Sequence, residues 1–126
     1  MIYIMKWEIE LYKTPRARYP VLNYIQSLRP KQRAKIEKVI DLLELHGIHL
    51  PYPYTKKIKG SRYKGLWELR INCDKSKFRI IYFLYMNNIF ILVSAFCKRK
   101  QKITKYELEI ARKRIIDYLN RNKRIN

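Results

Sequence analysis

Residues 66–97 read LWELRINCDKSKFRIIYFLYMNNIFILVSAFC. Apolar runs separated by short polar segments predict consecutive strands joined by hairpin turns, at 66–73, 77–85 and 89–97. Strands connected so closely pair as an antiparallel meander. Each run carries or adjoins cations, namely Arg70, Arg79 and the group Lys98, Arg99 and Lys100. We therefore expect one basic surface on this sheet, of a kind that binds phosphate.

The flanking sequence predicts helices and further strands. Apolar and polar residues alternate from Met5 to Leu11, which indicates a half-buried strand. Helical spacing predicts one helix over 19–28 and a second that begins at Pro30 and ends near Gly47. The tight junction between these two helices predicts an antiparallel hairpin. Residues 49–65 are expected to be a loop with one short strand at 57–59.

A last helix begins with a capping box formed by Thr104 and Glu107. The element order predicts an α+β fold with an antiparallel twisted sheet, an N-terminal helical hairpin and a C-terminal helix. We expect the helices to cover one face of the sheet and the cations to lie on the other. Residues 1–126 are expected to form a single domain, with a frayed basic tail over 121–126.

The charge of the chain indicates its partners. With 29 basic and 10 acidic residues, the formal net charge is +19. Such a protein attracts polyanions, with an affinity that falls as salt rises. The longest apolar run, Ile89–Cys97, is too short to span a bilayer, and the opening residues lack the basic leader of a signal peptide. We expect a cytoplasmic protein with no membrane partner.

Two further groups of cations are candidate binding residues. The loop before the meander interleaves its cations with Tyr52, Tyr54 and Tyr63, as single-stranded nucleic-acid surfaces do. Its cations are Lys56, Lys57, Lys59, Arg62 and Lys64. A second group, Lys98, Arg99, Lys100 and Lys102, follows the last strand, where crowded charge lowers lysine pKa values and favours proton transfer. A solvated loop and a solvated turn are the alternative interpretations.

Arg70 and Arg79 allow two interpretations. Glu68 and Arg70 point to one face of their strand, because side chains alternate. If Arg79 shares that face, the three residues form either a structural network neutralised by Glu68 or a phosphate clamp. His46 and His49 have no third ligand nearby, and three glycines do not make a nucleotide-binding loop. We expect no metal and no cofactor.

Five segments together resemble the HigB branch of the RelE/ParE toxin superfamily, in order from about residue 3 to residue 119. These are Lys57–Gly60, Gly65–Arg70, Phe78–Phe83, Phe96–Lys102 and Glu109–Arg114. The resemblance implies a RelE-like fold and a toxin neutralised by a helix-turn-helix, HigA-like antitoxin. It also implies metal-free cleavage of messenger RNA on the translating ribosome, with contacts to ribosomal RNA.

By position, Arg79 resembles the arginine that clamps the scissile phosphate, and Lys98 or Arg99 resembles the cation after the final strand. Arg70 resembles the strand cation of the tryptophan motif. Leu66 and Glu68 stand where RelE has lysines, and Leu108 stands where a tyrosine is expected, with Tyr106 nearby. We therefore expect Lys98 or Lys100 to transfer the proton. The lysines of the loop and Lys102 are expected to bind RNA or the ribosome.

Three other functions remain compatible with the sequence. A ParE-like inhibitor of DNA gyrase would share the fold without cleaving RNA. A nucleic-acid-binding module would hold RNA with the same cations and leave it intact. A degenerate toxin would survive only as the partner of its antitoxin.

Overall fold

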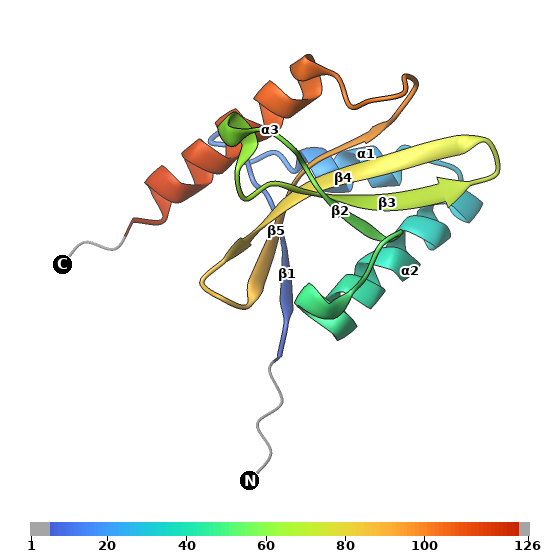
Figure 1. The fold of residues 1–126 in the computed structure, drawn as a ribbon, viewed down its shortest axis with the longest axis horizontal. Coiled ribbons are helices and arrows are strands. Elements are labelled where there is room, and N and C mark those ends of the chain that lie inside the picture. Colours follow the sequence, from blue (N-terminus) through green and yellow to red (C-terminus); the bar gives the residue numbers. More distant parts are fainter. Residues whose placement is uncertain (1–5, 124–126) are drawn as a thin grey trace, which may run out of the picture.

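The computed structural model describes residues 6–123, which form one five-stranded sheet flanked by helices (Figure 1). The strands are β1 (Glu8–Leu11), β2 (Thr55–Lys57), β3 (Trp67–Cys73), β4 (Ser76–Tyr85) and β5 (Ile89–Cys97). Residues 1–5 and 124–126 lie outside the described part. The predicted start of the first strand at Met5, the opening segment and the end of the expected tail therefore fall there.

The predicted meander is confirmed. Strands β3, β4 and β5 pair antiparallel in sequence order. A tight turn at Asp74 and Lys75 joins β3 to β4, and Asp74 adopts the left-handed backbone conformation with φ of 54°. This turn places Cys73 opposite Ser76, and the same register places Arg70 opposite Arg79. The turn therefore brings the two strand arginines together.

The sheet is mixed, so the prediction of a purely antiparallel sheet is wrong. Strand β1 lies at one edge and pairs parallel to β5, with Glu8 opposite Ile89. Alternation identified this strand but carries no information on the direction of its partner. Strand β2 forms the other edge, two residues earlier than predicted, and pairs antiparallel to β3. The full strand order is β1-β5-β4-β3-β2.

Helices α1 (Pro20–Gln26) and α2 (Pro30–His46) pack on one face of the sheet. Val21 and Leu43 join Ile80 and Leu92 in the core on this side. Each helix packs chiefly on a strand, α1 on β5 and α2 on β3, rather than on the other helix. Helix α2 ends at His46 and is capped by Gly47, whose φ is +57°, as the glycine stop predicted. A short 3₁₀ helix, η1 (Gly47–His49), follows.

Helix α3 (Lys105–Arg121) covers part of the opposite face, so the prediction that all helices share one face is wrong (Figure 1). Its Ile115 and Tyr118 pack in a second core with Phe83 and Val93. The strand residues of this core alternate with those of the first, which places the two cores on opposite sides. The open part of the second face lies beside β2 and β3, at the sheet edge away from β1.

The ends of α3 follow ordinary capping rules. The Thr104 hydroxyl accepts a hydrogen bond from the Glu107 amide at 3.3 Å, as the capping box predicted. The helix includes Arg121, which forms an ion pair with Asp117. The expected frayed tail therefore does not begin at residue 121.

Within residues 6–123, no helix is both long enough and apolar enough to cross a bilayer.

Candidate functional site

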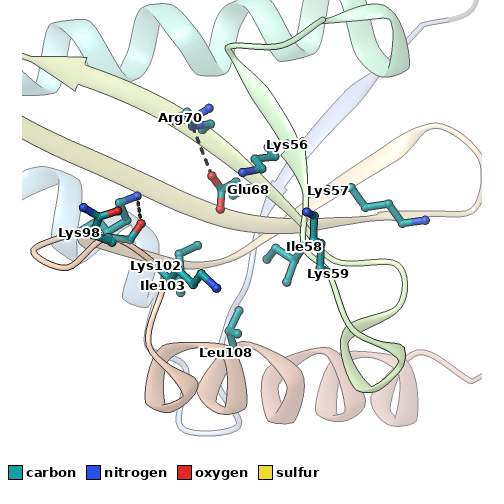
Figure 2. A pocket seen from close by; sticks show the side chains of 11 residues that line it. Lys56, Lys57, Ile58, Lys59, Glu68, Arg70, Lys98, Lys102, Ile103 and Leu108 are labelled. Carbon is teal, nitrogen blue, oxygen red and sulfur yellow. Dashed lines mark hydrogen bonds and ion pairs between the residues drawn. The ribbon is translucent and has the colours of Figure 1, made fainter.

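A basic pocket opens on the uncovered part of the second face, between β2, β3, the segment 98–103 and the start of α3 (Figure 2). Its volume is about 370 Å³. Its lining residues are Lys56, Lys57, Ile58, Lys59, Glu68, Arg70, Lys98, Gln101, Lys102, Ile103 and Leu108. Among them Glu68 is the one carboxylate, and six side chains are cationic. The pocket therefore has the charge to hold an anion.

Arg70, Arg79 and Glu68 form a cluster at the back of this pocket. The Glu68 Oε1 atom lies 3.3 Å from Arg70 Nε and 3.9 Å from Arg79 Nε. Arg79 is 1% exposed, and its Nη1 donates to Asn72 Oδ1 at 3.1 Å and to the Phe78 carbonyl at 2.8 Å. The structural network, one of the two interpretations that the sequence left open, is therefore present, with Glu68 between two arginines.

The cluster retains unused donors. Among the described residues, Arg70 Nε, Arg70 Nη1 and Arg79 Nε have no hydrogen-bond partner although all three atoms are buried. Buried donors without acceptors are costly, by about 1–3 kcal/mol each. Burial, followed by the charge of Arg70, lowers the pKa of Arg79. Arg70 is partly exposed to the pocket, so an anionic ligand there would accept hydrogen bonds from the exposed part of its guanidinium and offset the positive charge of the cluster.

Lys98 lies at the end of β5, where the chain turns toward α3. Its Nζ donates to the Gln101 carbonyl at 2.9 Å. Burial lowers the pKa of Lys98, and the charge of Arg79 lowers it further. Lys77 and Arg70, which lie on other strands, also lower the pKa of Lys98. The sequence neighbours Arg99 and Lys100 do not contribute to this shift. The lowered pKa makes Lys98 a better proton donor than an ordinary lysine.

Lys56, Glu68 and Arg70 lie together on the strands, and Lys102 reaches the same space from the segment before α3, whereas Lys57 extends away from Glu68 and Arg70 (Figure 2). The ladder places Lys56 opposite Glu68, which accounts for this proximity. Lys59 lines the pocket as well. Cations from the loop and from the segment after β5 therefore meet at one site.

Other predicted residues lie outside the pocket. Arg62, in the 3₁₀ helix η2 (Ser61–Tyr63), pairs with Glu109 of α3 at 2.7 Å. Lys64 is exposed, Tyr106 is 72% exposed, and neither lines the pocket. Arg99 and Lys100 line a neighbouring hollow together with Lys75, Lys77 and Lys98. The predicted basic loop is thus divided, and its second half is fastened to α3.

The pocket also has members that charge patterns did not reveal. Ile58, Ile103 and Leu108 form its apolar side, and all three belong to the second core or pack against it. Because the side of the sheet that α3 covers was predicted wrongly, these residues could not be placed beside the cations. Gln101 has no distinguishing signal in the sequence.

Tyr52 contacts the cluster from its outer side. The Arg70 guanidinium carbon lies 5.2 Å from the centre of the Tyr52 ring. Through hydrogen bonding and its charge, Arg70 lowers the pKa of the Tyr52 hydroxyl.

No group of three or more His, Cys, Asp or Glu side chains suited to a metal ion occurs between residues 6 and 123. The chemistry available in the pocket is anion binding by arginine and lysine and proton transfer by Lys98 or Glu68.

A family model described as Phage derived protein Gp49-like (DUF891) matches residues 23–115. The chain belongs to this Gp49-like family. The family is a RelE-like toxin family of toxin–antitoxin systems, and membership implies an antitoxin partner. The matched range includes every residue that lines the basic pocket. No curated protein matches this Gp49-like chain.

Proposed function

We propose that this chain is a HigB-like toxin with a RelE-like fold, built as one domain, that cleaves messenger RNA on translating ribosomes in the cytoplasm. A helix-turn-helix, HigA-like antitoxin neutralises it. Membership of the Gp49-like family supports the toxin assignment. The observation that carries the enzymatic part is the convergence of Arg70, Glu68 and Lys98 in one basic pocket.

The scissile phosphate binds in the basic pocket, beside Arg70. Arg70 lines the pocket, and the exposed part of its guanidinium donates to a phosphate oxygen. Arg79 is 1% exposed, so it acts from beneath the pocket, by holding Glu68 and adding positive charge rather than as the outermost clamp. The pocket lysines, Lys56, Lys57, Lys59 and Lys102, follow the RNA backbone. Lys64, Arg99 and Lys100 contact ribosomal RNA outside the pocket.

The proposed reaction is attack of a ribose 2′-oxygen on the adjacent phosphorus. The O2′–P bond forms, the P–O5′ bond breaks, and the products carry a 2′,3′-cyclic phosphate and a 5′-hydroxyl. Glu68, as the carboxylate of the pocket, accepts the 2′-hydroxyl proton once phosphate has taken over its arginine partners. Lys98, whose pKa is lowered, donates a proton to the leaving 5′-oxygen. Arg70 stabilises the charge that develops on phosphorus oxygens.

The proposal is tested with purified protein in a reconstituted translation reaction on one defined message. We expect cleavage that requires ribosomes and leaves 2′,3′-cyclic phosphate ends. Lys98→Met should slow cleavage by about 100-fold or more, as loss of a general acid does. Lys38→Met removes an exposed charge from α2, on the other face of the sheet, and serves as the matched control. An intact message with the wild-type chain contradicts the enzymatic proposal, and gyrase inhibition in a parallel assay would replace it.

A further inference from the structure

Tyr52 is an exposed aromatic ring held in a fixed place beside the basic pocket. It is 69% exposed, yet the turn that carries it is anchored on both sides. The Tyr54 amide donates to the Pro51 carbonyl at 3.0 Å, and the Thr55 hydroxyl donates to the Leu50 carbonyl at 2.8 Å. The Arg70 amide donates to the Tyr54 carbonyl at 2.8 Å, which ties the turn to β3. The ring therefore has a defined position without being part of a core.

The three tyrosines of the basic loop have different surroundings. Tyr63 donates to Glu109 at 2.7 Å and packs against the second core, so its ring serves the fold. Tyr54 is 39% exposed, so much of it is covered. Tyr52 is the most exposed of the three, and its described contact is with the arginine that lines the pocket. This combination separates Tyr52 from the other two.

The arrangement of Arg70 and Tyr52 matches what one nucleotide of single-stranded RNA requires. The guanidinium lies over the ring at 5.2 Å from its centre, and the exposure of the ring leaves surface available to a ligand. Proteins that bind single strands pair a cation for the phosphate with an aromatic ring for the base. A cation over an aromatic ring also holds that ring in place.

We infer that Tyr52 is a nucleobase platform, on which a base stacks while Arg70 binds a neighbouring phosphate. The inference rests on the proposed RNA-binding role of the pocket and adds to it a subsite for the base. Because every base has a flat aromatic face, the platform accepts all four bases and gives affinity rather than sequence selection. Hydrogen-bonding groups for base edges would have to come from elsewhere, such as the ribosome.

The test uses a ligand that cannot be cleaved. A fluorescently labelled 2′-O-methyl RNA trinucleotide lacks the attacking hydroxyl, and a second trimer of the same backbone has abasic sites in place of its bases. Dissociation constants are measured for both by fluorescence anisotropy at one fixed salt concentration. Tyr52→Ala should weaken binding of the base-carrying trimer by about tenfold or more, as removal of one stacking ring does. It should leave binding of the abasic trimer unchanged, and Tyr52→Phe should restore the affinity.

Tyr19→Ala is the matched control. Tyr19 is 38% exposed and also lies beneath a cation, with Lys13 Nζ 6.0 Å from its ring centre, but it lines a different hollow. This substitution should change neither dissociation constant. The Tyr19 variant thus reports what loss of an exposed tyrosine does by itself.

Two outcomes overturn the platform while the proposed function stands. If Tyr52→Ala weakens both trimers equally, Tyr52 only supports Arg70. If it weakens neither, the ring binds no base. Failure of the proposed function is distinct: if Tyr52→Ala weakens only the base-carrying trimer but wild-type protein cleaves no message, the chain is an RNA-binding protein with an intact platform. Wild-type protein that binds neither trimer overturns the RNA pocket and the platform together.

Discussion

Arg70 and Arg79 lie directly opposite each other on β3 and β4, and Glu68 contacts both. Like charges directly opposite each other in a ladder destabilise a sheet. Here one arginine is fully buried and the other is largely so, with its side chain 19% exposed. The pair persists because Glu68 supplies the opposing charge, yet one carboxylate leaves the cluster with a net positive charge. We propose that a phosphate bound here neutralises the remaining positive charge.

Replacement of Glu68 by glutamine tests whether this carboxylate stabilises the fold by neutralising Arg70 and Arg79. Glu68→Gln keeps the size of the side chain and removes its charge. We expect the free energy of unfolding to fall by about 2–3 kcal/mol, because two poorly solvated cations lose their counterion. Urea denaturation measures this change, with Glu37→Gln on the exposed side of α2 as the control. Equal stability of the two variants would show that Glu68 does not neutralise the arginines.

Gly47 packs directly against the Trp7 ring, so adding a single side-chain carbon there should destabilise the fold. A Cβ atom there would lie 2.0 Å from Trp7 Cε2, and its φ of +57° disfavours any side chain. We expect Gly47→Ala to lower the free energy of unfolding by about 3 kcal/mol or more, since a buried indole must move. Gly65→Ala shares the positive φ, at +90°, but meets nothing within 4 Å. In the same denaturation assay it should cost about 1 kcal/mol; equal losses would contradict the packing argument.

The helices and the meander were predictable, because helical spacing, proline and glycine positions, and short turns are local signals. The register that places Arg70 opposite Arg79 was also nearly predictable. Once Asp74 and Lys75 are known to form the whole turn, counting back from Cys73 and Ser76 fixes the register. The prediction assigned Ser76 to the turn, which left the register of the two strands open.

The side that α3 covers could not be derived from its own sequence. An amphipathic stripe shows that a helix packs but not against which face of a sheet. A signal nevertheless existed in β4, where Phe78, Ile80, Ile81, Tyr82 and Phe83 are all buried. Continuous apolar sequence in a strand is typical of a sheet covered on both faces. The burial of Arg79 follows from its place in the same strand.

Glu109 makes the stability depend on pH in a defined window. Hydrogen bonds from Arg62 and Tyr63 lower the pKa of Glu109 from 4.5 to about 2. A carboxylate whose pKa is lower in the folded state contributes stability above its unfolded pKa and loses it as pH falls. We expect wild type to exceed Glu109→Gln in stability at pH 6, with the difference shrinking between pH 4.5 and about 2. Thermal unfolding at each pH measures it; a constant difference would contradict this pairing.

Lysines inside and outside the pocket should differ in their effect on RNA binding. When a protein makes one fewer phosphate interaction with a single strand, the slope of log affinity against log salt becomes shallower by about 0.7. Lys102→Ala should show this change with a 2′-O-methyl RNA oligomer, because Lys102 lines the pocket. Lys38→Ala, on the opposite face, should leave the slope unchanged although it removes the same charge. Identical slopes for both variants would mean that RNA binds the general charge rather than the pocket.

Mapping the 5′ ends of cellular RNA tests most directly whether the basic pocket that Arg70 lines cleaves messenger RNA. The chain is induced without an antitoxin, alongside Arg70→Gln and the control Lys38→Met, with folded protein verified for each. We predict abundant new 5′-hydroxyl ends within coding sequences for wild type and Lys38→Met, reduced by about 100-fold or more in Arg70→Gln. Growth arrest with intact messages, or unchanged cleavage by Arg70→Gln, would contradict the assignment.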